Sequence, residues 1–142
     1  SGLYGMLRPL DQIQPYRLEM GTKISIGSNN DLYSFWKKKV TEQLKDELKK
    51  DELVVNLASR EYFSVIDSDL ISNTIVSPEF KDFKDGKLKI ISFFAKKARG
   101  MMARYLIEKN TSSLEDIRSF SKDGYYYSDE ETKNMMCPVF IR

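Results

Sequence analysis

The sequence contains no histidine and only one cysteine, Cys137, among its 142 residues. Without histidine, neither a Ser–His nor a Cys–His nucleophile pair can form within the chain. A zinc site built from Cys and His ligands is excluded for the same reason. A single cysteine cannot form an internal disulfide, which fits a reducing compartment. We interpret Cys137 as a small buried apolar residue rather than a reactive thiol.

Long apolar runs are also missing, since none approaches the roughly 18 to 20 residues that span a bilayer. The first residues do not form a secretory leader. We therefore expect a soluble, cytoplasmic protein. The chain opens on Ser1-Gly2-Leu3-Tyr4-Gly5, without an initiator Met, so we expect it to begin inside a domain. The net charge is +2, which is close to balance, so any electrostatic argument depends on where the charges lie.

The pattern of apolar and polar residues predicts a single mixed α/β unit. Apolar residues three or four apart predict a helix over 31–50, with Asn30 or Asp31 as its N-cap, and a second long helix over 95–109. Ser112 and Glu115 have capping-box spacing before a third helix over 113–121. A short helix over 60–66 is expected to be capped by Ser59.

Strands are predicted between these helices. Residues 53–57 read as a central strand buried on both faces. Residues 73–82 and 87–93 form a hairpin through the turn Asp85-Gly86. Residues 125–127 and 138–141 are terminal strands, and residues 3–7 end a further one. Residues 8–21 form a proline-stiffened loop and 27–30 a turn.

Three segments carry candidate anion-binding residues. The helix over 95–109 follows a strand directly, so its N–H groups and its cations favour anions at a strand's carboxyl end. The loop 8–17 offers two arginines and a tyrosine for phosphate or carboxylate. The turn 56–62 lets a ligand approach the backbone. The candidates are Lys96, Lys97, Arg99, Arg8, Tyr16, Arg17, Asn56, Ser59 and Tyr62.

Plainer roles exist for each segment. The basic helix face can be solvated surface, the arginines can bond backbone carbonyls, and Ser59 can be a simple N-cap. Acid–base groups are available in Asp11, Glu19, Glu61 and Asp67, but sequence spacing does not bring any two together. No glycine-rich phosphate-binding motif is present.

Several longer stretches resemble the YaaA family of bacterial peroxide stress proteins. They are SGLYGMLRPLD (1–11), QPYRLEMG (14–21), DLYSFW (31–36), VNLAS (55–59) with EYF (61–63), KIISFFAKKARG (89–100) and GYY (124–126). They occur in family order and cover nearly the whole chain. The resemblance implies the C-terminal portion of an α/β fold called the cantaloupe fold, with flanking helices and a positively charged cleft, and an absent N-terminal part.

The resemblance also implies protection from hydrogen peroxide, a limit on intracellular iron, and DNA binding. A helix-hairpin-helix element described for the family is expected in the absent part. The resemblance favours a shared role for the matched cations Arg8, Arg17, Lys96, Lys97 and Arg99. The alternative is an enzyme acting on a small anionic or nucleotide-like substrate, although a binding role is favoured. No catalytic residue, metal site or cofactor is predicted, and the expected partners are DNA or another phosphate-bearing ligand and the absent part of the same fold.

Overall fold

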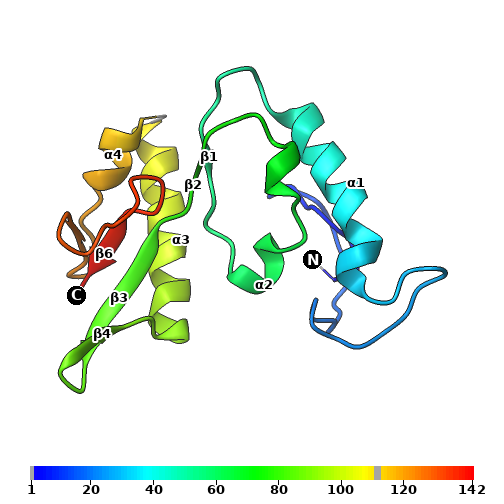
Figure 1. Cartoon of the computed structure of the whole chain (residues 1–142), viewed down its shortest axis with the longest axis horizontal. Coiled ribbons are helices and arrows are strands. Elements are labelled where there is room, and N and C mark those ends of the chain that lie inside the picture. Colours follow the sequence, from blue (N-terminus) through cyan, green and yellow to red (C-terminus); the bar gives the residue numbers. More distant parts are fainter. Residues whose placement is uncertain (1, 111–112) are drawn as a thin grey trace. The chain divides into compact units, whose positions relative to one another are not determined.

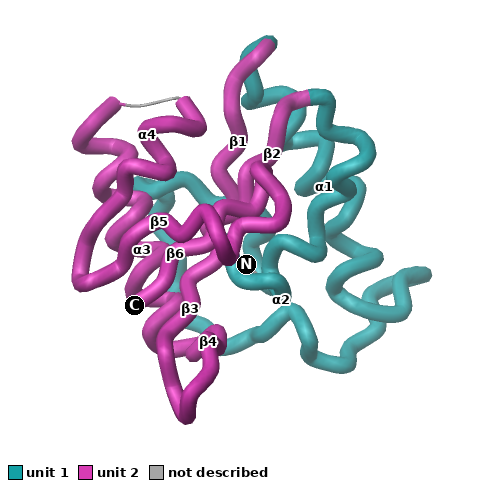
Figure 2. Tube along the Cα trace, turned by 60° about the vertical axis from the view of Figure 1, so that its left-hand side comes forward, with its two compact units in different colours: residues 1–50, 58–72 teal, residues 51–57, 73–142 magenta. Residues whose placement is uncertain are grey.

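The computed structural model describes residues 2–110 and 113–142. The chain folds into two compact units (Figures 1 and 2). Unit 1 comprises residues 1–50 and 58–72, and unit 2 comprises residues 51–57 and 73–142. The predicted fold class is confirmed, because helices and a mixed sheet alternate along the chain. No helix among the described residues is long and apolar enough to cross a membrane.

Unit 1 is organised around helix α1 (Leu32–Glu47), which confirms the predicted helix and is three residues shorter at its end. Asp31 is the N-cap: its carboxylate accepts the Ser34 N–H at 2.7 Å, and the Ser34 hydroxyl accepts the Asp31 N–H at 3.3 Å. This reciprocal pair fixes the helix start, because it satisfies two donors that the helix itself leaves unpaired.

The rest of unit 1 is mostly loops. Helix α2 (Arg60–Phe63) is a single turn, followed by the 3-10 turn η1 (Ser68–Leu70). The predicted helix 60–66 was therefore too long, and the Ser59 side chain makes no capping hydrogen bond. Residues 3–7 form turns, so the strand predicted there was wrong. The loop over 8–21 and the turn at 27–30 are confirmed, the turn by a bridge between Ile26 and Asn29.

The core of unit 1 gathers Met20, Leu32, Val40 and Val65, with Trp36 packed at its side. The Trp36 indole N–H donates to the Gly2 carbonyl at 2.9 Å, which fixes the ring. Gly5 lies against that ring with a φ of +70°, and a Cβ there would sit 2.8 Å from a ring carbon. Glycine is thus required for both backbone and steric reasons.

Unit 2 contains a four-stranded sheet in the order β4-β3-β6-β5. Strand β3 (Glu79–Lys84) pairs antiparallel with β4 (Lys87–Lys89) and parallel with β6 (Val139–Ile141), while β5 (Tyr126–Ser128) pairs antiparallel with β6. Asp85 and Gly86 both have positive φ, 54° and 74°, so the predicted hairpin turn is confirmed. A second, two-stranded parallel sheet pairs β1 (Val54–Val55) with β2 (Ile75–Val76).

Helix α3 (Ser92–Lys109) packs against the sheet through Ala95, Ala98, Met102 and Tyr105, which are buried with Phe80, Phe120, Tyr125 and Phe140 in one aromatic core. The helix begins three residues earlier than predicted, so the strand predicted over 87–93 stops at Lys89. Beta-branched and aromatic residues at 90–94 resemble strand sequence, and the packing of α3 on the sheet overrides that preference.

The remaining elements of unit 2 are short. Helix α4 (Leu114–Arg118) is shorter than the predicted 113–121; its N-cap is Ser113, whose hydroxyl accepts the Asp116 N–H at 3.0 Å. The predicted cap Ser112 lies outside the described residues. The predicted strand 73–82 is divided into β2 and β3 at Ser77-Pro78. Strand β1 is half-buried and, within the described part of the chain, pairs only with β2, so the prediction of a central strand buried on both faces was wrong. Cys137 is half-buried rather than buried.

Candidate anion-binding site

The first candidate residues lie at the start of α3 in unit 2. The helix begins two residues after β4, its N-cap Ile91 provides no side-chain hydrogen bond, and its first turn holds no acidic residue. Lys96 and Lys97 follow one turn later, and both are exposed. The positive end of the helix and these two ammonium groups thus lie within the first two turns of α3, and each favours a negative charge nearby.

The three predicted cations of α3 have different surroundings. Lys97 lies 3.3 Å from the Asp123 carboxylate, with 58% of its side chain exposed. The Arg99 Nε–H donates to the Ala95 carbonyl one turn earlier, at 3.1 Å. Lys96 pairs with no acidic side chain of residues 2–110 and 113–142. Of these two neighbouring lysines, Lys96 is thus the one without an acidic partner in the described part of the chain.

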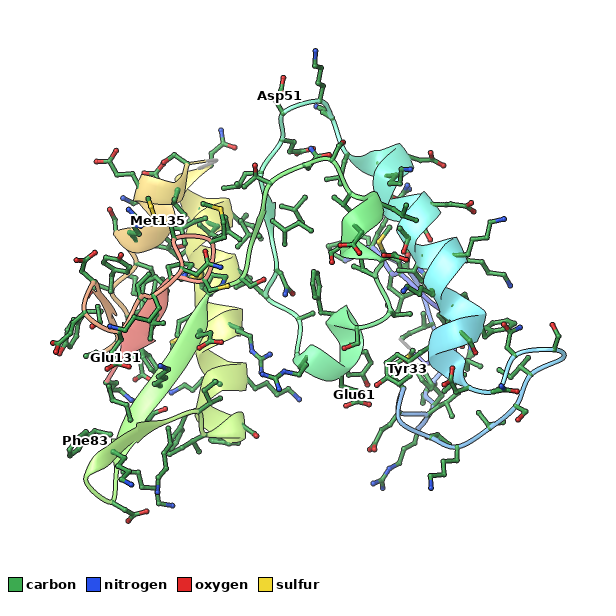
Figure 3. All side chains as sticks on the ribbon, in the orientation of Figure 1. Tyr33, Asp51, Glu61, Phe83, Glu131 and Met135 are labelled. Atoms are coloured by element: carbon green, nitrogen blue, oxygen red, sulfur yellow. The ribbon has the colours of Figure 1, made fainter. Side chains whose placement is uncertain are left out.

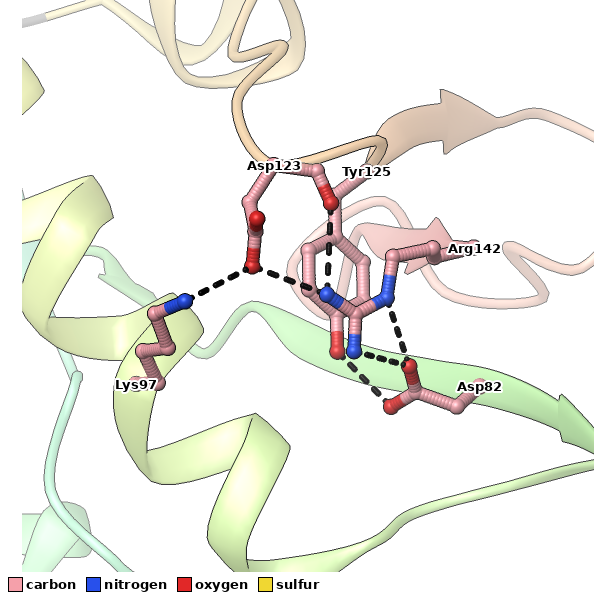
Figure 4. Close-up of polar contacts among 5 residues, drawn as sticks. All are labelled: Asp82, Lys97, Asp123, Tyr125 and Arg142. Atoms are coloured by element: carbon pink, nitrogen blue, oxygen red, sulfur yellow. Dashed lines mark hydrogen bonds and ion pairs between the residues drawn. The ribbon is translucent and has the colours of Figure 1, made fainter.

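Asp123 connects Lys97 to a polar network that joins β3, β6 and the turn before β5 (Figure 4). The Arg142 Nη1 donates to the Asp123 carboxylate at 2.8 Å, and its Nε donates to Asp82 at 2.8 Å. The Arg142 Nη2 forms an ion pair with the same Asp82 oxygen at 2.7 Å. The Tyr125 hydroxyl donates to the other Asp82 oxygen at 2.7 Å. Asp82 is 5% exposed, so its charge is stable there only because these donors surround it.

The network holds Arg142 between two aromatic rings, those of Phe94 at 4.8 Å and Tyr125 at 4.6 Å. Burial alone would lower the pKa of Arg142, but its hydrogen bond to Asp82 and the nearby charges raise it. Burial, and then the hydrogen bond to Asp82, raises the pKa of Tyr125. Because all three guanidinium nitrogens of Arg142 already contact Asp82 or Asp123, this residue stabilises the fold and holds Asp123 near Lys97.

The arginines of the loop 8–17 lie in unit 1. Arg8 forms an exposed ion pair with Glu47 at 3.0 Å, and its backbone N–H donates to Asp11 at 2.7 Å. Arg17 is exposed and pairs with no acidic side chain within the described part of the chain. The Tyr16 ring contacts Tyr4 edge to face, with ring centroids 5.3 Å apart. Of the two arginines, Arg17 is the one available to a ligand.

Tyr16 and Tyr62 are brought together in unit 1. Burial raises the pKa of Tyr62, and the charges of Glu61, Tyr16 and Glu19 raise it further. Burial, and then the charge of Glu61, likewise raises the pKa of Tyr33 (both residues are labelled in Figure 3). Glu61 also accepts the Gly21 N–H at 3.3 Å, so the loop over 14–21 is tied to α2.

Tyr62 lines a pocket of about 320 Å³ whose other lining residues are Gly5, Met6, Leu7, Met20, Trp36, Val40, Val65 and Ile66. Its walls are apolar apart from the tyrosine hydroxyl and the backbone, so the pocket suits an uncharged group better than an anion. Ser59 stands before α2 without capping it. Asn56, in unit 2, donates from its side chain to the Ser77 hydroxyl at 3.0 Å.

A family model described as "Peroxide stress protein YaaA" matches residues 1–131. The chain belongs to the YaaA family. It is 56% identical over 133 residues to a UPF0246 protein of Flavobacterium johnsoniae, covering 94% of this chain and 53% of the relative. It is 51% identical over 144 residues to a UPF0246 protein of Shewanella woodyi, covering all of this chain and 56% of the relative. The chain thus spans about half the length of these curated relatives.

Within this YaaA-family chain, the polar network was missed by sequence reasoning. Tyr125 was placed in a strand and in the stretch GYY, Asp82 was placed only at the end of the predicted strand 73–82, and Asp123 and Arg142 were given no role. One local signal existed: Asp123-Gly124 is a turn sequence, and both residues have positive φ, 53° and 80°. A Cβ on Gly124 would lie 3.2 Å from the Arg142 side chain, so glycine at this turn leaves room for that arginine.

The described residues include no group of three or more His, Cys, Asp or Glu side chains that could hold a metal ion. The candidate anion-binding groups in unit 2 are Lys96, Lys97 and the start of α3. In unit 1 they are Arg17, Tyr16 and Tyr62.

Proposed function

We propose that the full-length protein acts in the response to peroxide stress and that the first half of α3 binds a phosphate-bearing ligand, with DNA as the first candidate. The observation that carries the proposal is a run without acidic residues: residues 86–107 hold six basic residues and no Asp or Glu. This run covers β4 and most of α3, including the exposed Lys96 and Lys97. Cations concentrated on one element attract polyanions even when the net charge is near zero.

The physiological part of the proposal is supported by membership of the YaaA family. Protection from hydrogen peroxide and a limit on intracellular iron belong to the full-length protein in this proposal. Cells that lack the gene should survive a peroxide challenge poorly and contain more iron detectable by electron paramagnetic resonance. The wild-type gene should restore both values, and normal survival of the deletion strain would contradict the stress role.

DNA binding is tested on the full-length protein with a duplex oligonucleotide over a series of salt concentrations. Each phosphate contact contributes about 0.9 to the slope of log affinity against log salt. The variant Lys96→Ala/Lys97→Ala/Arg99→Ala should weaken binding and reduce that slope by about 2 to 3. These side chains are exposed or half-buried, so the fold should tolerate their loss.

A matched control removes three positive charges outside α3, at Lys38, Lys45 and Lys50, which are all exposed. If α3 supplies the phosphate contacts, the control should keep most of the wild-type slope. Equal effects of the two triple variants would assign binding to overall charge, and wild-type affinity in the α3 variant would remove the basis for the proposal.

We also propose, as the alternative, an enzyme that acts on a small anionic or nucleotide-like substrate. The observation that favours it is that Tyr16 and Glu19, from the loop that carries Arg17, act on Tyr62 of α2 together with Glu61. Tyr62 also lines the apolar pocket of unit 1, which could take the uncharged part of such a substrate. Tyrosines and carboxylates at a pocket are groups used in acid–base catalysis. Thermal melting of the full-length protein with nucleotides and with inorganic phosphate tests it, because a ligand raises the melting temperature when it binds only the folded state. No shift with any compound would contradict this alternative.

A further inference from the structure

Strand β1 occupies a position that its sequence does not suit. The run Leu53, Val54, Val55 and Leu57 is nearly all apolar, which is typical of a strand buried on both faces within a parallel sheet. In the structure β1 is half-buried, and among residues 2–110 and 113–142 it pairs only with β2. Parallel sheets occur almost only where both faces are covered, and a lone pair of strands is marginally stable.

The hydrogen bonds of β1 show which edge is occupied. The Val54 N–H donates to the Thr74 carbonyl at 2.9 Å, and the Asn56 N–H donates to the Val76 carbonyl at 2.7 Å. In a strand of a parallel sheet, alternate residues direct their peptide groups to the same neighbour. The N–H groups of Val55 and Leu57 therefore point to the opposite edge, where no residue in 2–110 or 113–142 accepts them.

The chain segment that follows β2 is hydrogen-bonded on its opposite edge. The Val76 carbonyl faces β1, whereas the Ser77 N–H donates to Met136 at 2.8 Å and the Glu79 N–H to Pro138 at 2.9 Å, on the side of β6. The segment from β2 into β3 is thus bonded on both edges. The sheet can extend at this end only past β1.

We propose that the edge of β1 formed by Val55 and Leu57 binds an additional strand from the part of the full-length protein that lies outside these 142 residues. The curated relatives are nearly twice as long as the segment they share with this chain, so a chain portion of about equal size is available to supply it. The added strand turns β1 into an interior strand, which matches its apolar sequence. This proposal does not depend on anion binding by α3.

Amide hydrogen exchange of the full-length protein, followed residue by residue by NMR, tests the proposal without any substitution. Val54 and Asn56 are internal controls, because β2 already accepts their N–H groups. The amides of Val55 and Leu57 should exchange at least about 100-fold more slowly than in an unstructured peptide, as slowly as the two controls. Fast exchange at Val55 and Leu57 beside protected controls, or fast exchange at all four, would overturn the proposal.

The source of the strand is tested by repeating the exchange at decreasing protein concentration together with sedimentation velocity. Protection of Val55 that persists in a monomer shows that the same polypeptide supplies the strand. Protection that disappears on dilution as a dimer dissociates would assign the strand to a second copy and refute the stated occupant.

Discussion

Replacing Asp82 by Asn tests whether the buried polar network holds unit 2 together. The carboxylate is 5% exposed and receives the Tyr125 hydroxyl and two nitrogens of Arg142, all within 2.8 Å. Asparagine keeps the shape of the side chain, and its carbonyl oxygen can still accept from the guanidinium, but it removes the negative charge. Its NH2 group cannot accept from the Tyr125 hydroxyl as the second carboxylate oxygen does. Arg142 then keeps only Asp123 as an acidic partner.

The size of the loss follows from these contacts. Breaking a fully buried ion pair costs about 3–5 kcal/mol, because the remaining charge is left without a partner. The Arg142 side chain is 29% exposed and retains Asp123, and the Tyr125 hydroxyl can turn to accept from the new amide. We therefore expect Asp82→Asn to lower the free energy of unfolding by about 2–3 kcal/mol.

Urea denaturation followed by far-ultraviolet circular dichroism measures this change. The control is the same substitution at Asp85, whose ion pair with Lys89 is exposed, with 70% of the Asp85 side chain accessible. Asparagine tolerates the positive φ of 54° at this position, so Asp85→Asn should change stability by less than about 1 kcal/mol. Losses of the same size in the two variants would show that burial of the network contributes nothing and would refute the reasoning.

Three further predictions follow from local geometry. Because burial raises the pKa of Tyr125, wild-type stability should fall as the pH rises above 10.0, the ordinary tyrosine value. In urea unfolding, Tyr125→Phe should show a smaller fall, since Tyr33 and Tyr62 also have raised pKa values. Gly5→Ala should lower the free energy of unfolding by about 2–4 kcal/mol, because the new Cβ would meet the Trp36 ring; Trp36 fluorescence follows the unfolding. Gly27→Ala is the control, since Gly27 has a φ of +60° but no neighbour within 4 Å, and it should cost about 1 kcal/mol. Hydrogen bonds at the helix start lower the pKa of Asp31 below 3.8, so its stabilisation should be lost as the pH falls through that lowered value, and circular dichroism of Asp31→Asn should be less sensitive to acid.

Sequence patterns predicted the parts of the fold that local interactions determine. Helix α1 and its cap Asp31 follow from apolar periodicity and one side chain, and the β3–β4 hairpin follows from Asp85-Gly86. The start of α3 was missed because Ile91 provides no capping side chain and residues 90–94 have strand-like composition. The packing of its buried stripe on the sheet decides that boundary, and this contact is not local.

The polar network could not be predicted from spacing. Tyr125 and Arg142 are 43 and 60 residues from Asp82 in sequence, so only the pairing of β3 with β6 brings them together. The candidate cations were found more easily, because clustered lysines on one predicted helix are visible in the sequence. The sequence did not show which of these cations already has an acidic partner. A cation with such a partner attracts an anionic ligand less strongly than one without.

Lys96 and Lys97 are neighbours with the same side chain, and the structure separates their expected roles. Asp123 lies 3.3 Å from the Lys97 ammonium group, so a phosphate that approaches Lys97 must share it with a fixed negative charge. No described acidic side chain pairs with Lys96, and its full charge is available. Lys96→Ala should therefore weaken duplex binding by the full-length protein more than Lys97→Ala does. The slope of log affinity against log salt should fall by about one unit in Lys96→Ala and by less in Lys97→Ala. Equal losses would mean that the ligand displaces Asp123 without cost, and a larger loss at Lys97 would mean that Asp123 holds that ammonium group in place for the ligand instead of competing with it.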